Sequence, residues 1–295
     1  MKIHNLTSIK TDGFMGRLFT PETVSKKSVI VITGSEGGIK NAEFIAEKFA
    51  ERGINALAVA YFKIKGVKHD LNEVPVEYIE KAAVYLKEKT SCDKVAIYGI
   101  SKGGELSLLS ASLFPDIDCV VAVVPNYFVT SGFNKMRCPI GDVSAWSFRG
   151  KPLPFVPVVA NPLNIFKSYL KDDVNIKGYY KAIVEAEVPE EAVIKVENSN
   201  AAILCLSALH DIVWASKIAS EKVVERLKNA EFPYDFEHRC FEKVSHFLCP
   251  LPENYAKKPK LMFKIEKQHP KECNESREKS FEIAVEWIMK YNNIR

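Results

Sequence analysis

The sequence has no long hydrophobic run and no strong excess of charge of either sign. No apolar run reaches the 18 residues that suggest a membrane-spanning helix. The first seven residues, MKIHNLT, lack the apolar core of a secretory signal peptide. The net charge of +4 over 295 residues falls short of the basic footprint of a nucleic-acid-binding protein. We therefore expect a cytoplasmic protein that neither spans a membrane nor binds nucleic acid.

Paired cysteines are also missing. The chain has seven cysteines, an odd and scattered set without a C-x-x-C pair. Cys119 and Cys205 lie inside apolar runs, where cysteine behaves as a small core hydrophobe. This distribution argues against a disulfide framework and against a zinc site. The phosphate-binding pattern G-x-x-x-x-G-K-[ST] is absent too, and we expect neither a metal nor a cofactor.

Apolar runs alternate with stretches of helical periodicity over much of the chain. The expected strands are residues 28–33, 54–61, 94–98, 119–124, 201–207 and 234–241. The expected helices are residues 40–52, 76–89, 103–113, 216–229 and 277–291. Near-continuous apolar strands that alternate with amphipathic helices are typical of a parallel sheet covered on both faces. The pattern predicts an α/β fold with a mostly parallel central sheet and helices on both faces.

This alternation stops over residues 126–200, which contain several prolines and aromatic residues. So long an irregular stretch usually has a function in a compact domain, and it predicts a lid-like insert that caps a site. A meandering surface excursion is the alternative. At the N-terminus, residues 1–26 have room for a short β-hairpin at 13–20. Because no repeat or linker interrupts the chain, we expect residues 1–295 to form a single domain.

The segment that carries chemistry is VAIYGISKGGEL, residues 95–106. It reads as a strand, a turn of pattern Gly99-x-Ser101-x-Gly103, and a helix. A nucleophile elbow has this context, because its turn is so tight that the flanking positions must be glycine. The helix N-terminus behind the serine offers free N–H groups where an oxyanion would form. We predict that Ser101 is the nucleophile of a hydrolase, with a plain turn serine as the alternative.

A serine hydroxyl needs a base, and the base needs an acid that orients it. In doubly wound hydrolases these partners follow the serine in the order acid, then histidine, in loops after later strands. Asp211 follows the expected strand 201–207, and His246 follows the expected strand 234–241. We predict that Asp211 and His246 complete a catalytic triad. Asp211 has an alternative as the cap of the helix at 216–229, and His210 lies beside it.

The oxyanion hole needs two backbone N–H donors. We expect one from Lys102, the residue after the nucleophile, and one from the loop of residues 34–38, GSEGG. By position Glu36 is the second donor, with Ser35 as the neighbouring choice and a tight βα turn as the structural alternative. Lys102 is expected to act locally through its backbone amide, and Glu105 as a hydrogen-bond partner near the helix start; neither side chain is assigned a catalytic role.

The segment GISKGGEL around Ser101 resembles the elbow of the acyl-CoA thioesterase / bile acid-CoA:amino acid N-acyltransferase family, in its C-terminal catalytic domain. Further stretches are similar to the same family: GSEGG at 34–38, VPVEYIE at 74–80, SFRGKPLP at 147–154, DIVWAS at 211–216 and VVERL at 223–227. The resemblance covers about residues 27–252. It implies an α/β-hydrolase fold, similar to that of dienelactone hydrolases, which carry cysteine at the elbow.

What the resemblance implies is hydrolysis of acyl-CoA thioesters by Ser101, Asp211 and His246. Serine as nucleophile points to water as the acceptor, since the branch that transfers acyl groups to amino acids carries cysteine. The chain departs from the family in three places. Only about 26 residues precede the first sheet strand, where acyl-CoA-hydrolysing members usually carry a β-sandwich domain. His210 stands where a second aspartate is frequent, and Val244-Ser245 replaces Ala-Gly before the histidine.

Two other functions use the same fold. One is a carboxylesterase or dienelactone-hydrolase-like enzyme that cleaves small oxygen esters with the same triad. The other is a non-catalytic binding protein. For either hydrolase the expected partner is a small-molecule acyl ester or acyl-CoA, and a homo-oligomer is compatible with the sequence.

The aromatic residues of the insert are expected either to line an acyl pocket or to pack a lid; they are Tyr127, Phe128, Phe133, Trp146, Phe148 and Phe155. Trp214 is expected to anchor the acid loop.

Overall fold

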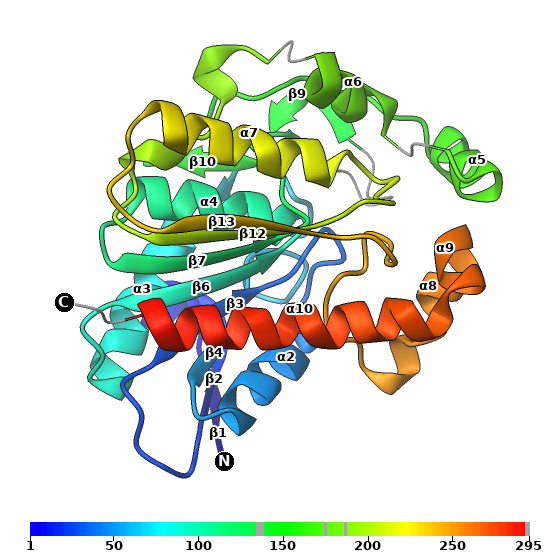
Figure 1. The fold of residues 1–295 in the computed structure, drawn as a ribbon. Coiled ribbons are helices and arrows are strands. Elements are labelled where there is room, and N and C mark those ends of the chain that lie inside the picture. The colour runs from blue at the N-terminus through cyan, green and yellow to red at the C-terminus, as the bar shows by residue number, and fades with distance from the viewer. Residues whose placement is uncertain (134–138, 174–175, 186–187, 293–295) are drawn as a thin grey trace.

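An eight-stranded sheet forms the centre of the protein (Figure 1). The computed structural model describes residues 1–133, 139–173, 176–185 and 188–292. The strand order is β1-β2-β4-β3-β6-β7-β12-β13, parallel from β4 to β13 and antiparallel at the β1-β2 edge. The strands are β1 (Lys2–Leu6), β2 (Met15–Thr20), β3 (Ser28–Ile32), β4 (Asn55–Ala60), β6 (Val95–Ile100), β7 (Ile117–Val123), β12 (Ala202–Ala208) and β13 (Phe236–Phe241). This confirms the α/β fold with a mostly parallel sheet.

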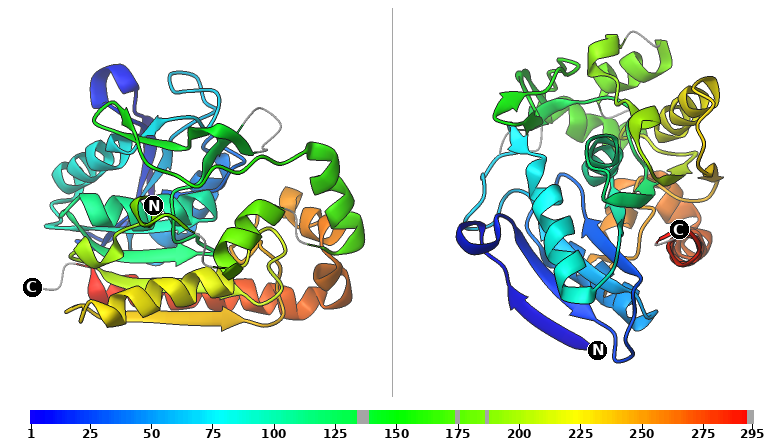
Figure 2. Two further views of the ribbon diagram at one scale, coloured as in Figure 1. Left: turned by 90° about the horizontal axis from the view of Figure 1, so that it is seen from above. Right: turned by 90° about the vertical axis from the view of Figure 1, so that its left-hand side faces the viewer.

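Helices cover both faces of the sheet, as expected (Figures 1 and 2). One face packs on α2 (Lys40–Glu51) and α10 (Pro270–Tyr291). The other packs on α3 (Glu77–Thr90), α4 (Lys102–Leu113) and α7 (Ser216–Asn229). Within one strand the side chains alternate between the two cores, so that in β3 Val29 and Val31 join the first and Ile30 and Ile32 the second. This double burial is why the central strands read as continuous apolar runs.

Most elements lie where the pattern predicted them, and three regions differ. The N-terminal strand pair spans residues 2–20 and not 13–20: β1 pairs with β2, and the short helix α1 (Ile9–Asp12) joins them. The C-terminal helix α10 begins at Pro270, seven residues before the expected start. Ahead of it lie three unexpected short helices, η3 (Glu253–Tyr255), α8 (Lys258–Met262) and α9 (Lys264–Gln268). No helix among the described residues is long and apolar enough to cross a membrane.

The expected insert contains more regular structure than its prolines suggested. Its elements are β8 (Ser131–Phe133), β9 (Pro139–Ser144), β10 (Trp146–Phe148), β11 (Lys151–Pro152), α5 (Pro162–Lys171), α6 (Lys177–Glu185), η1 (Glu190–Ala192) and η2 (Val196–Asn198). Strand β10 pairs with β5 (Val74–Pro75), which lies outside the insert. It lies over α4 and α7 (Figure 1), and Phe128 and Tyr179 join the core on that side of the sheet. Six cysteines are free, and Cys138 lies outside the described residues.

Candidate active site

Ser101 stands at the sharp turn between β6 and α4. Its backbone has φ 58° and ψ −116°, a conformation that non-glycine residues rarely adopt and that concentrates at functional sites. A Cβ atom on Gly99 would lie 2.1 Å from the carbonyl oxygen of Gly103, and one on Gly103 would lie 2.7 Å from that of Thr33. Both positions therefore require glycine, which is the physical reason for the Gly99-x-Ser101-x-Gly103 pattern.

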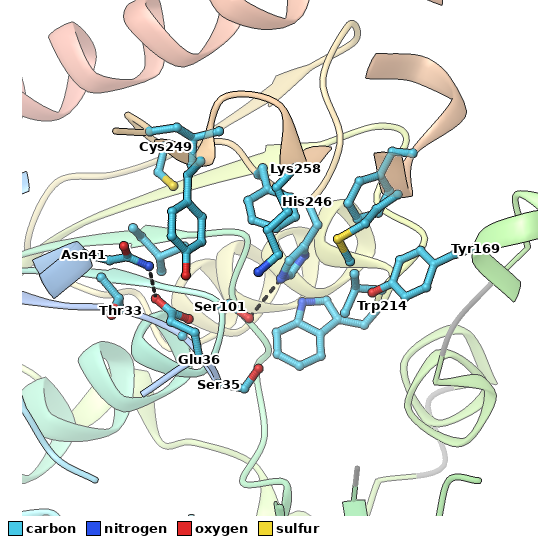
Figure 3. A pocket seen from close by; sticks show the side chains of 18 of the residues that line it. Thr33, Ser35, Glu36, Asn41, Ser101, Tyr169, Trp214, His246, Cys249 and Lys258 are labelled. Carbon is cyan, nitrogen blue, oxygen red and sulfur yellow. Dashed lines mark hydrogen bonds between the residues drawn. The ribbon is translucent and has the colours of Figure 1, made fainter. Parts of the chain in front are cut away.

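The structure brings Ser101, His246 and Asp211 into one hydrogen-bonded relay. His246 Nε2 lies 2.9 Å from Ser101 Oγ (Figure 3), and His246 Nδ1 lies 2.8 Å from Asp211 Oδ2. An ionised carboxylate can only accept, so the ring proton belongs on Nδ1 and Nε2 is left to accept from the serine hydroxyl. Asp211 and His246 come from the loops after β12 and β13, as the sequence predicted. Such a relay can deprotonate a serine as it attacks a carbonyl.

The acid loop is held by its own backbone and by a tryptophan. Asp211 Oδ1 accepts from the backbone N–H of Val213 at 3.0 Å, which leaves Oδ2 for the histidine. Trp214 Nε1 donates to the carbonyl of Val124 at 3.1 Å, at the end of β7. The expectation that Trp214 anchors this loop fits these bonds, but its ring also lines the cavity above Ser101.

The histidine loop is fastened to the C-terminal helices by a buried ion pair, which the sequence analysis missed. Ser245 Oγ donates to Glu266 Oε1 at 2.7 Å, and Arg277 forms an ion pair with the same carboxylate. Arg277 Nε also donates to the carbonyl of Phe247 at 2.8 Å. Ser245 is one of the two departures from the family in this loop, and its hydroxyl provides the link to Glu266. A buried carboxylate of this kind is invisible in a sequence until its partner is known.

The loop of residues 34–38 lies against the elbow. A Cβ atom on Gly34 would lie 3.1 Å from that of Ser101. The buried Tyr61 hydroxyl donates to the carbonyls of Thr33 and Gly34, at 2.6 and 3.1 Å, and so fixes the start of the loop. The side chain of Glu36 accepts from Asn41 Nδ2 at 3.3 Å and lines the cavity (Figure 3). Lys102 begins α4, where the first N–H groups of a helix have no partner within it.

The side chains of Lys102 and Glu105 form a fully buried ion pair beneath the elbow. Their Nζ and Oε2 atoms are 3.5 Å apart and both side chains are inaccessible. Glu105 also accepts from the Thr130 N–H at 3.0 Å and from Trp146 Nε1 at 2.7 Å, which ties α4 to the insert. Burial lowers the pKa of Lys102 to about 8, although the charge of Glu105 acts in the opposite direction. The hydrogen bonds agree with the role predicted for Glu105, whereas the buried ion pair of the Lys102 side chain was not predicted.

A cavity of about 320 Å³ opens above Ser101. Its wall is mostly apolar. It comes from the elbow, the loop of residues 33–36, the start of α2, the acid and histidine loops, helix α5, residues 250–263, and two residues of the insert, Phe133 and Ile176. The aromatic residues that line it are Phe133, Tyr169, Trp214, Phe247, Tyr255 and Phe263. Of the six insert aromatics expected either to line an acyl pocket or to pack a lid, only Phe133 is among these lining residues. Phe128 and Trp146 are fully buried in the core, and Tyr127 lines a separate groove.

The remaining histidines have other surroundings. His238 lies within β13 and shares a 2.7 Å hydrogen bond with Ser207 Oγ, while His210 is exposed beside the acid. Neither takes the place of His246 or Asp211 in the relay. Over the described part of the chain, no three His, Cys, Asp or Glu side chains are grouped so that they could hold a metal ion.

Comparison with solved structures supports the α/β-hydrolase fold. A putative dienelactone hydrolase from Klebsiella pneumoniae superposes with a TM-score of 0.59 at 15% identity, covering 99% of this chain and 100% of that one. An acylaminoacyl peptidase from Pyrococcus horikoshii gives 0.58 at 11% identity, over 100% of this chain and 42% of the peptidase. At these identities the likeness concerns the fold alone.

Comparison with known sequences is more specific. Mouse acyl-coenzyme A thioesterase 1 is 27% identical over 234 residues, which are 78% of this chain and 50% of the thioesterase. Mouse mitochondrial acyl-coenzyme A thioesterase 2 is also 27% identical, over 78% of this chain and 47% of its own. The chain thus spans about half the length of these relatives. The family profile described as BAAT / Acyl-CoA thioester hydrolase C terminal matches residues 74–260, more than half of the chain and all three members of the relay. The chain belongs to this family.

Proposed function

We propose that the protein hydrolyses acyl thioesters of the acyl-CoA class through a covalent acyl-enzyme on Ser101. The observation that carries the proposal is the relay from Ser101 through His246 to Asp211 at the base of an apolar cavity, in a member of this family. Each of the three groups has the geometry that its role requires.

In the first half of the reaction, Ser101 Oγ attacks the thioester carbonyl carbon while His246 Nε2 takes its proton. Asp211 keeps the imidazole in the required tautomer and stabilises the imidazolium. The tetrahedral oxyanion receives hydrogen bonds from the backbone N–H groups of Lys102 and Glu36, which form the proposed oxyanion hole. The intermediate then collapses, the C–S bond breaks, and His246 returns the proton to the leaving thiolate.

In the second half, water replaces the thiol. His246 removes a proton from a water molecule as the water attacks the acyl-ester carbonyl, and the same oxyanion hole holds the second intermediate. Collapse of this intermediate releases the carboxylic acid, and the proton passes from His246 back to Ser101 Oγ. The net reaction is thioester plus water to acid plus thiol, with no external oxidant or reductant.

The cavity supports an apolar acyl group as the portion bound next to Ser101. Phe133, Trp214 and Phe263 present ring surface to it, and its volume is in the range of small-molecule sites. The proposal includes residues 1–295 as one domain and residues 126–200 as its cap. The contacts of Phe128 and Tyr179 with the main core support that arrangement. A cytoplasmic location stays a prediction.

The decisive experiment compares matched substrates. Acyl-CoA thioesters and p-nitrophenyl esters of the same acyl groups are assayed with the wild type and with Ser101→Ala, and labelling by a fluorophosphonate probe is measured on both. We expect a higher kcat/KM on the CoA thioesters, labelling of the wild type, and loss of labelling and of both activities in the variant. Activity on oxygen esters alone would instead identify a carboxylesterase. A wild type that the probe does not label would favour a binding protein.

A further inference from the structure

Helix α5 has a wider apolar surface than the cavity covers. Pro162, Ile165 and Tyr169 line the cavity. Leu163, Phe166 and Leu170 instead point to solvent, with exposed fractions of 66%, 62% and 74%. At about 100° per residue the two strips are adjacent, and together they occupy about 160° of the helix circumference. The exposed strip is therefore a direct continuation of the cavity wall onto the surface of the protein.

The large exposed apolar side chains gather in this part of the chain. Among the described residues fifteen such side chains are found, and six of them lie between positions 159 and 184: Val159, Leu163, Phe166, Leu170, Tyr180 and Val184. Scattered single residues of this kind are ordinary, but the three on α5 adjoin the cavity wall, and a contiguous apolar patch marks an interaction site.

The opposite rim of the cavity is strongly basic. Residues 253–267 contain five lysines, of which Lys257, Lys260, Lys264 and Lys267 are exposed. The two carboxylates of this segment do not balance them, because Glu266 is buried in its ion pair with Arg277. Leu261, in the middle of these lysines, has an exposed fraction of 78%. This rim presents positive charge with an apolar side chain among it.

The two rims lie at one end of the molecule. The rings of Tyr169 in α5 and Phe263 after α8 meet edge to face, with centroids 5.4 Å apart. Lys258 and Met262 of α8 line the cavity from that side. Figures 1 and 2 show α5 beside α8 and α9 at the same end. The apolar strip of α5 and the lysines of residues 257–267 thus flank a single cavity mouth, and we call the two together the mouth surface.

We propose that the mouth surface docks on an anionic lipid membrane. Leu163, Phe166 and Leu170 would enter the boundary between headgroups and acyl chains, as the apolar face of an interfacial helix does. The lysines of residues 257–267 would lie at the level of the headgroups, where each basic residue adds to binding. A second copy of the chain fits less well, because a two-fold contact through this surface would place the same lysines near one another. Docking does not depend on the proposed hydrolysis.

The test is co-sedimentation of the full chain with lipid vesicles. Vesicles of phosphatidylcholine alone are compared with vesicles that also contain phosphatidylglycerol. We expect the wild type to bind the anionic vesicles and to bind the neutral ones much more weakly. High salt should weaken binding as well, because it screens exposed charges.

Two triple variants separate the apolar and basic contributions. Leu163→Ser with Phe166→Ser and Leu170→Ser should weaken binding to anionic vesicles by about tenfold or more. Lys257→Glu with Lys260→Glu and Lys264→Glu should weaken it by about a hundredfold. Each has a matched control elsewhere on the surface: serine at Val24, Val84 and Met289, and glutamate at Lys10, Lys228 and Lys279.

The outcomes are decisive in either direction. The proposal is supported if both triple variants lose vesicle binding while the controls bind within about twofold of the wild type, and if all variants keep the wild-type thermal midpoint. A wild type that ignores anionic vesicles would overturn it, and so would a control that loses binding as strongly as its matched variant. If size-exclusion chromatography shows a dimer that the α5 variant dissociates, a second copy covers the strip and the membrane proposal is wrong.

Discussion

The indole ring of Trp214 stands edge-on to the imidazole of His246, with ring centroids 5.3 Å apart and planes at 88°. The indole nitrogen donates to the carbonyl of Val124, whose φ of 42° is unusual for a β-branched residue. One side chain therefore connects the proposed base, the acid loop and the strained end of β7. The indole packs against the imidazole ring, while both ring nitrogens of His246 keep their hydrogen bonds to Ser101 and Asp211.

Replacing Trp214 should separate these contributions. Trp214→Phe keeps an aromatic edge near His246 but leaves the Val124 carbonyl without its donor, which should cost about 1–3 kcal/mol of unfolding free energy. Trp214→Ala also removes the ring and should cost about 3–5 kcal/mol. Hydrolysis should fall further in the alanine variant, because the imidazole loses its lateral support. Urea unfolding and steady-state kinetics measure both effects, and a phenylalanine variant as stable as the wild type would contradict a role for the Val124 bond.

The elbow should tolerate no side chain at Gly99. A methyl group there would overlap the carbonyl of Gly103 and the hydroxyl of Ser107, each 2.1 Å away. We expect Gly99→Ala to lower the unfolding free energy by at least about 3 kcal/mol. The control is Gly150→Ala, at a φ of 74° with open space around it, where only backbone strain of about 1–2 kcal/mol applies. Equal losses in the two variants would show that steric overlap does not explain the motif.

Asp211→Asn should leave the acid loop in place and still disable the relay. The amide oxygen can accept from the Val213 N–H, but the amide NH₂ cannot accept from His246 Nδ1. The imidazole then takes the wrong tautomer, and kcat should fall by about 10⁴-fold with little change in stability. The exposed Asp235→Asn serves as the matched control and should keep wild-type kcat. Near-normal turnover in Asp211→Asn would remove Asp211 from the proposed mechanism.

The buried Lys102 should make stability depend on pH. Burial lowers its pKa from 10.5 to about 8, so between these values the unfolded chain holds a proton that the folded chain has released. Unfolding free energy therefore rises with pH across this window, by about 3 kcal/mol for this group. The stabilisation is complete above pH 10.5 and is lost as the pH falls through 8.

Lys102→Met should abolish this contribution, while Lys228→Met, at an exposed position of α7, should retain it. Urea unfolding at several pH values between 8 and 10 measures the slope for the wild type and both variants. If the slope of Lys102→Met equals that of the wild type, the buried ammonium is not its source.

The central sheet could be predicted because its strands are buried on both faces. Val29 to Ile32 are apolar at every position since alternate side chains enter different cores. Short elements could not be predicted in the same way. Helix α8 has only five residues, too few for helical periodicity to be distinguished. At its end the ring of Phe263 packs on those of Tyr169 and Phe247, which are distant in sequence.

The direction of each aromatic side chain was also beyond prediction. Phe128 and Phe133 are only five residues apart in the insert and both are buried in the core, yet only Phe133 also lines the cavity. Which of these surroundings an aromatic residue meets depends on chain segments that are distant in sequence. The same holds for Tyr255 and Phe263, which no local pattern marked as cavity residues.

The sequence by itself determined the α/β alternation, the elbow at Ser101, and Asp211 and His246 as its candidate partners, because each depends on local pattern and chain order. Only the tertiary structure decided how they meet: His246 Nε2 reaches Ser101 Oγ across 145 residues. It also decided that Glu266 and Arg277 hold the histidine loop, and that α5 faces both the cavity and solvent. Such contacts depend on the packing of separate segments, which no local spacing encodes.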